Sequence, residues 1–353
     1  MTLVAASLAG LVAMAAVDED QDGLDDRVED AVAERFAPIV FHGDQESSFP
    51  TSVESWLALT HLSTLDNIAA PRRTERIVTG PLRPWQLLNR TATIDGIDVS
   101  SSSSRTRTKQ LTFFLEDVPS AQRPRLVRPG EWITYAHSFP NDAGGITIQY
   151  WRAYMWNDAS FLGIDVGHGG DWEAVSVHLD ARQQPTRVSF LDHTGIVDGG
   201  AAVQWEGTHP LVWSEEGGHS SSPDKHRSRS ARWIRHETWT GGRVTLADGT
   251  TAGASGGLRN VGEKLHPRDG QAFIQYSGLW GAPGRMFMTS GYWGPAFNET
   301  GATCRGGAPA YASYLRPRAK SDQCLPLTMN AWCDGMAPAF ARTLECHAST
   351  EPP

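Results

Sequence analysis

The chain has 353 residues, of which 40% are hydrophobic and 20% are charged, and its formal net charge is -9. This length can hold one large β-rich domain or two average domains. The net charge is negative, and the sequence has no stripe of lysine and arginine between aromatic residues. It therefore lacks the usual features of a nucleic-acid-binding protein. Thirteen tryptophans and thirty-five glycines indicate a folded protein of many short strands joined by turns.

An apolar run, MTLVAASLAGLVAMAA, opens the chain, and small residues precede the first acidic position. A run of this kind is typical of a secretory signal, although no lysine or arginine stands ahead of it. It is too short to be a transmembrane helix. We therefore expect residues 1–17 to be a signal peptide and the mature protein to be secreted and extracellular.

An acidic segment, DEDQDGLDDRVE, follows directly. Counted from its first residue, carboxylates occupy positions 1, 3, 5, 9 and 12, and glycine occupies position 6: Asp18, Asp20, Asp22, Asp26 and Glu29, with Gly23. This spacing matches the calcium loop of an EF-hand. The hydrophobic spacing after it predicts a helix over about Asp25–Phe36 that ends before Pro38. We expect residues 18–37 to hold a structural calcium ion; the alternative is a solvated acidic linker.

Short segments rich in β-branched and aromatic residues follow, separated by Gly, Pro, Asn or Asp. They include RIVTG, LTFFLE, WITYAH, ITIQYWRAYMW, EAVSVHLD, RVSFLDH and PLVW. We predict a mostly β fold, an antiparallel β-sandwich over residues 38–300 with peripheral helices and long loops.

All four cysteines lie in the last segment, residues 301–353: Cys304, Cys324, Cys333 and Cys346. An even number of cysteines in an exported chain predicts two disulfides, with three pairings open, that staple this C-terminal extension. A zinc site is the weaker alternative, because no C-x-x-C pair is present.

The stretch GHGGDWE, residues 167–173, precedes the strand-like run AVSVHLD. Residues i and i+2 of a strand face the same way, about 6.6 Å apart, so Asp171 and Glu173 project together while Trp172 and Ala174 point to the other face. Two such carboxylates repel each other by about 2 to 3 kcal/mol at an effective dielectric near 20. A bound cation would remove this repulsion.

Two further side chains can join these carboxylates. Gly169 and Gly170 let the backbone curl so that the His168 imidazole turns back to the same point. Asp158 ends the preceding predicted strand, and antiparallel pairing would place it beside the His168 loop. One nitrogen and three carboxylates suit Mg²⁺, Ca²⁺ or Mn²⁺ best, with zinc open. The predicted metal ligands are Asp158, His168, Asp171 and Glu173; the alternative is a glycine-rich turn with exposed acids.

The same motifs resemble a known family. GHGGDWE is similar to the GHRHDWE heptapeptide of the necrosis-inducing family of secreted microbial proteins, with glycine at its third and fourth positions. ITIQYWRAYMWNDAS, VSFLDHTG, GTHPLVW and GGHSSSP resemble further elements of that family in the same order. APIVFHGDQESSFPTSVESWL resembles the start of the vacuolar-protein-sorting-associated protein 62 family. The resemblance implies a β-sandwich with a metal-occupied acidic pocket at one rim and the same four ligands.

These observations lead to two functional hypotheses. The first is a secreted, divalent-metal-dependent binding protein that recognises a glycan or lipid headgroup, at a membrane surface and with a toxin-like or cytolytic action. The second is a secreted metal-dependent hydrolase or lyase acting on a glycan or phosphoester, in which His193 or His219 transfers a proton. The oligomeric state stays open.

Overall fold

The computed structural model describes residues 17–66, 73–78, 81–83, 93–94, 97–98, 103–105, 110–123, 128–141, 144–161, 164–192, 195–225, 230–263, 267–268, 270–276 and 279–282. Residues 1–16 of the predicted signal, His193 and the four cysteines with their predicted disulfides lie outside these ranges.

The central sheet carries the GHGGDWE stretch on one of its inner strands. Its strands run in the order β14 (Gly195–Asp198), β13 (Pro185–Asp192), β12 (His168–Leu179), β9 (Ile146–Asn157), β8 (Ile133–Pro140) and β21 (Gly257–Asn260). The pairing is antiparallel except between β21 and β8, which run parallel.

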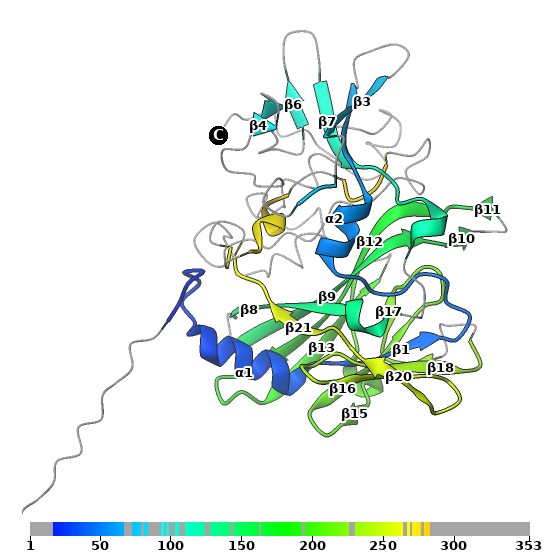
Figure 1. Cartoon of the computed structure of the whole chain (residues 1–353). Coiled ribbons are helices and arrows are strands. Elements are labelled where there is room, and N and C mark those ends of the chain that lie inside the picture. The colour runs from blue at the N-terminus through cyan, green and yellow to red at the C-terminus, as the bar shows by residue number, and fades with distance from the viewer. Residues whose placement is uncertain are drawn as a thin grey trace, which may run out of the picture.

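A second sheet packs against one face of the central sheet (Figure 1). It contains β15 (Trp205–Glu206), β16 (His209–Ser214), β1 (Ile39–Gly43), β18 (Trp233–Glu237), β19 (Arg243–Thr245) and β20 (Thr251–Ala254), and β17 (Ser221–Ser222) pairs with β16. Strands β1 and β16 run parallel to each other. The mostly β, predominantly antiparallel sandwich predicted from the sequence is confirmed.

A third sheet lies on the opposite side of the central sheet, at the top of Figure 1. Its strands are β3 (Arg73–Val78), β2 (Leu62–Asp66), β7 (Gln110–Leu115) and β6 (Ser103–Arg105). Two strand pairs stand apart from these sheets, β10 (Ser160–Phe161) with β11 (Ile164–Asp165) and β4 (Thr93–Ile94) with β5 (Ile97–Asp98). Short 3₁₀ turns occur at Ser120–Gln122, Pro129–Glu131, Gly200–Ala202 and Ala272–Gln275.

Two α-helices in the described part of the chain cover the sheets. Helix α1 (Asp26–Phe36) begins after Asp25, whose side chain accepts a hydrogen bond from the Arg27 N–H and caps the helix. It buries its apolar face in the core between the two larger sheets, and it agrees with the predicted helix to within one residue. Helix α2 (Val53–Leu59) lies between the central and third sheets. Within the described residues, neither helix has the length and apolar composition needed to cross a membrane.

Both faces of the central sheet are buried, so every residue of β12 is buried. Val175 and Val177 lie in the core shared with α1 and the second sheet. Trp172 and Ala174 lie in the core on the other face, with α2 and the third sheet. The predicted alternation along this strand is therefore confirmed. Two hydrophobic cores, one on each side of β12, hold the end of the strand that carries the candidate site.

Two histidines are fully enclosed between these sheets. His42 of β1 and His236 of β18 stack with ring centroids 5.8 Å apart, beside Phe49 and Trp132. No ring nitrogen of either histidine has a hydrogen-bond partner among the described residues. Burial lowers the pKa of His236 to about 3 and that of His42 well below its usual value. Both rings are therefore neutral inside the folded protein at any moderately acidic pH.

This burial predicts a specific loss of stability in acid. Below about pH 6.5 both histidines become protonated in the unfolded chain but not in the folded protein. Each histidine therefore lowers the free energy of unfolding by up to about 1.4 kcal/mol per pH unit. Between pH 7 and pH 4.5, the free energy of unfolding of His236→Leu should fall by about 2 kcal/mol less than that of the wild type. Urea unfolding at several pH values measures this slope. Equal slopes for the wild type and His236→Leu would contradict the prediction.

Candidate functional site

The candidate site lies where one end of β9 meets the beginning of β12. The antiparallel register pairs Asn157 with His168, Tyr154 with Asp171, and Arg152 with Glu173. The expected proximity of the two segments is confirmed. The residue directly opposite His168 is Asn157, however, and Asp158 follows it.

A buried histidine joins two carboxylates at the centre of the site. His219 Nδ1 lies 2.9 Å from Asp171 Oδ2, and its Nε2 lies 3.5 Å from Glu46 Oε1. The imidazole stacks on Tyr154, with ring centroids 3.9 Å apart and planes 4° from parallel. Asn157 Nδ2 also donates to Asp171 Oδ2, over 2.9 Å. Three segments distant in the sequence are therefore linked through one ring.

The charges of this group stabilise one another. Burial alone would lower the pKa of His219, but the charge of Glu46 and the hydrogen bond to Asp171 outweigh it and raise this pKa to about 10. Burial raises the pKa of Asp171, yet His219 brings it below its usual value by hydrogen bonding and charge. Burial raises the pKa of Glu46, but the charge and hydrogen bond of His219, together with hydrogen bonds from backbone N–H groups, outweigh it and lower this pKa. These interactions favour the protonated form of His219, which links the two carboxylates.

Glu173 lies further along the same face, next to a buried arginine. Its side chain is 5% exposed, and its Oε2 has no hydrogen-bond partner among the described residues. Arg152, which is fully buried, donates through Nη2 to Ser221 Oγ over 2.5 Å. Burial, with the charge of Asp171, raises the pKa of Glu173 well above its usual value despite Arg152. This carboxyl group lacks full compensation for its burial.

The other two predicted ligands differ in exposure. Asp158 is exposed, and its carboxylate accepts hydrogen bonds from Trp156 Nε1, over 2.7 Å, and from Ser47 Oγ. His168 is 4% exposed, and its Nδ1 lies 3.2 Å from the Gly169 carbonyl oxygen. Burial lowers the pKa of His168 and outweighs the charge of Asp171, which favours the neutral imidazole that metals bind.

The four predicted ligands share one end of the β9–β12 pair but do not converge on one point. Within the described residues, three ligand atoms lie within 4.8 Å of one another only in the N-terminal loop. Asp171 contacts the His219 imidazole. Sequence reasoning identified Asp171 and Glu173 as neighbours. It missed Asn157, which donates to Asp171, Arg152, whose charge lies beside Glu173, and Glu46, which pairs with His219. Asn157 adjoins the predicted Asp158, whereas no local pattern connects Glu46 to this strand.

The adjacent glycines of GHGGDWE, Gly169 and Gly170, serve the packing of the strand. Gly170 has φ of +70°, and a Cβ there would lie 1.6 Å from the Trp280 carbonyl oxygen. A Cβ on Gly169 would lie 2.0 Å from Asp117 Oδ1. The backbone at Trp280 and Gly281 therefore crosses close to the start of β12, and only glycine leaves room for it. This close approach explains why both positions require glycine. The sequence alone predicted only that these glycines let the chain curl toward His168.

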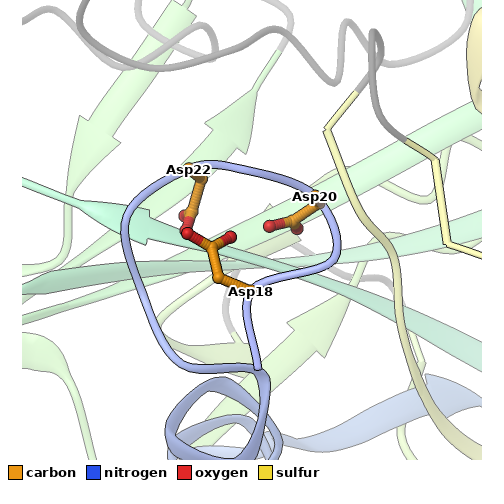
Figure 2. Close-up of side chains that lie close together, drawn as sticks. All are labelled: Asp18, Asp20 and Asp22. Carbon is orange, nitrogen blue, oxygen red and sulfur yellow. The ribbon is translucent and has the colours of Figure 1, made fainter. Parts of the chain in front are cut away.

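A second acidic site lies in the N-terminal loop. Figure 2 shows the carboxylates of Asp18, Asp20 and Asp22 pointing toward one another. Their ligand atoms lie within 4.8 Å of one another, and so do those of Asp20, Asp26 and Glu29. Burial raises the pKa of Asp20 to about 6 and that of Asp22 to about 7. This cluster of carboxylates could hold a metal ion, and its members are those predicted from the EF-hand spacing.

No family model and no curated protein matches the sequence. Among solved structures, the chain is similar to necrosis and ethylene inducing protein 2 from the causal agent of cocoa's Witches Broom disease, at 15% identity over 55% of this chain and 67% of that chain, with a TM-score of 0.30. It is similar to a mutant of NLPPya at 14% identity over 77% and 90%, with a TM-score of 0.36. NLPPya in complex with mannosamine is 13% identical over 73% and 83%, with a TM-score of 0.34.

Proposed function

We propose that the protein binds a polar, hydroxyl-rich ligand, a glycan or a lipid headgroup, through a divalent cation held at the paired ends of β9 and β12. The candidate ligands are Asp158, His168, Asp171 and Glu173, and the ion would have to draw their side chains together, because their ligand atoms do not already converge on one point. Under this proposal the protein is secreted and meets its ligand at a membrane surface, where a toxin-like action follows. Mg²⁺, Mn²⁺ and Ca²⁺ are the ions that suit this set of donors.

The observation that carries the proposal is the incomplete compensation of Glu173. Its buried Oε2 has no partner among the described residues, and Asp171 adds a second negative charge on the same face. Burying a carboxylate without full pairing costs several kcal/mol. A divalent cation is attracted to such a group, and a bound ion offers open coordination positions to ligand hydroxyl oxygens.

The surroundings of Asp171 support the same assignment. His219 and Asn157 both donate to a single oxygen, Oδ2. Donors of this kind orient a carboxylate that ligates a metal and are part of well-built metal sites. His168 also fits, because burial favours its neutral form. The residues present therefore have the chemistry that a hard divalent ion requires.

Asp158 offers the sharpest test because it is the exposed member of the set. Asp158→Asn should weaken metal binding at this site at least about tenfold, whereas the free energy of unfolding should change by less than about 0.5 kcal/mol, as is usual at the surface. Calorimetric titration of chelator-treated protein with Mn²⁺ measures the first quantity. Titration with mannosamine, a defined hexosamine probe, in the presence of the metal measures ligand binding.

Asp248→Asn is the matched control. Asp248 is likewise exposed and likewise accepts two hydrogen bonds, from the Thr250 N–H and Oγ1, but it lies in a distant turn. Each variant is titrated in an Asp20→Asn background, so that metal binding by the N-terminal loop does not contribute to the signal. The metal-dependent proposal fails when the wild type binds no divalent ion, or when Asp158→Asn and Asp248→Asn bind it equally well.

A further inference from the structure

The N-terminal loop contains a buried carboxylate that accepts no hydrogen bond from the described residues. Asp20 is 0% exposed, and neither of its oxygens has a hydrogen-bond partner among the described residues. Asp22 Oδ2 and Glu29 Oε1 are also buried and without a partner there. Figure 2 shows Asp20 directed toward Asp18 and Asp22. Ionised oxygens are rarely left in this state without a bound cation.

The backbone of the loop has the shape that a calcium loop requires. Gly23, at the sixth position, has φ of +95°, and its N–H donates to Asp18 Oδ2 over 3.2 Å. The Leu24 N–H donates to Asp22 Oδ1 over 2.7 Å. The acidic side chains at the first, third and fifth positions therefore project inward around a sharp turn, as in an EF-hand loop.

One arginine from a distant segment contacts the acidic residues at the end of this loop and the start of α1. Arg268 Nη2 bonds Glu29 Oε2 and lies 3.3 Å from Asp26 Oδ1. Its Nη1 lies 3.0 Å from Asp30 Oδ1, and its side chain is 13% exposed. The guanidinium thus neutralises part of the charge of this loop and ties it to the chain beyond β21.

We propose that the Asp18–Glu29 loop binds one calcium ion and that Arg268 limits its affinity by holding one oxygen of Glu29. The ion would sit between Asp18, Asp20, Asp22 and Glu29, the residue that supplies the last ligand of an EF-hand loop. Arg268 contributes a fixed positive charge beside it and competes with the ion for Glu29. This site is independent of the one proposed at β12.

Calorimetric titration of chelator-treated full-length protein with Ca²⁺ and, separately, with Mg²⁺ tests the proposal. The wild type should bind Ca²⁺ more tightly than Mg²⁺, because the loop offers many oxygen ligands in a flexible arrangement. Asp20→Asn should weaken Ca²⁺ binding at least about tenfold, since it removes the central charge of the loop. Glu19→Gln is the matched control, because Glu19 lies in the same loop and is exposed; it should bind Ca²⁺ within about twofold of the wild type.

Arg268→Gln distinguishes this arrangement from a plain acidic loop. Removing the guanidinium frees Glu29 and makes the electrostatic potential at the loop more negative. Ca²⁺ affinity should therefore increase by about three- to tenfold. The melting temperature without Ca²⁺ should fall, and its rise on adding Ca²⁺ should be larger than in the wild type. Unchanged or weaker affinity in Arg268→Gln would refute the role of this arginine.

Two outcomes would overturn the calcium site itself. One is a wild type that binds no Ca²⁺ after chelation. The other is Ca²⁺ binding that survives Asp20→Asn but is lost in Asp158→Asn, which would assign the ion to the site at β12. If Asp20→Asn does not fold, Glu29→Gln provides the same test, because it removes the charge of the last ligand while keeping the shape of the side chain.

Discussion

Gly170→Ala is expected to lower the free energy of unfolding by about 4 kcal/mol, the sum of a left-handed backbone penalty and severe overpacking. The added Cβ would lie 1.6 Å from the Trp280 carbonyl oxygen, and φ of +70° already disfavours any side chain. Because the contacting atom belongs to the backbone, no rotamer change can relieve the clash. Either β12 or the segment at Trp280 must move. Urea unfolding monitored by tryptophan fluorescence measures the loss.

Gly144→Ala separates the two contributions to this loss. Gly144 has φ of +71°, almost the same as Gly170, but a Cβ there would meet no atom within 4 Å. This variant should lose only about 1 kcal/mol, the backbone penalty alone. A similar loss in both variants would show that the approach of the Trp280 backbone is not what demands glycine in GHGGDWE.

Asp171→Asn is expected to cost about 3 kcal/mol near pH 6, because it removes one partner of a buried ion pair. His219 would then keep its charge with Glu46 alone, whose Oε1 lies 3.5 Å away. An asparagine keeps the size of the side chain, so the loss reports charge and hydrogen bonding more than packing. The exposed Asp158→Asn serves as the stability control and should unfold like the wild type.

The cost of Asp171→Asn should depend on pH in a defined direction. The folded pKa of His219 is raised from 6.5 to about 10. Its stabilisation is therefore fully present below pH 6.5 and is lost as the pH rises through 10. The difference between the wild type and Asp171→Asn should shrink steadily between pH 6.5 and pH 10. A difference that stays constant over this range would show that His219 is not the charged partner of Asp171.

Much of the local structure could be predicted from the sequence because it depends on neighbours along the chain. The alternation that turns Asp171 and Glu173 toward one core and Trp172 toward the other is a property of any strand. The cap and hydrophobic spacing that place α1 are equally local. The convergence of Asp18, Asp20 and Asp22 also follows from a short loop pattern.

The environment of these residues depended on the tertiary structure. His219 reaches Asp171, and Glu46 reaches His219, only because the second sheet packs against the central sheet. Arg268 reaches Glu29 from a segment beyond β21. Contacts between distant segments depend on how whole sheets and loops pack, which no short pattern encodes. The sequence by itself determined that Asp18, Asp20 and Asp22 would gather in one loop and that Asp171 and Glu173 would share one face of a strand. The tertiary structure decided which positively charged side chains pair with these acids. A buried carboxylate requires a positively charged partner, and folding can bring that partner from any part of the chain.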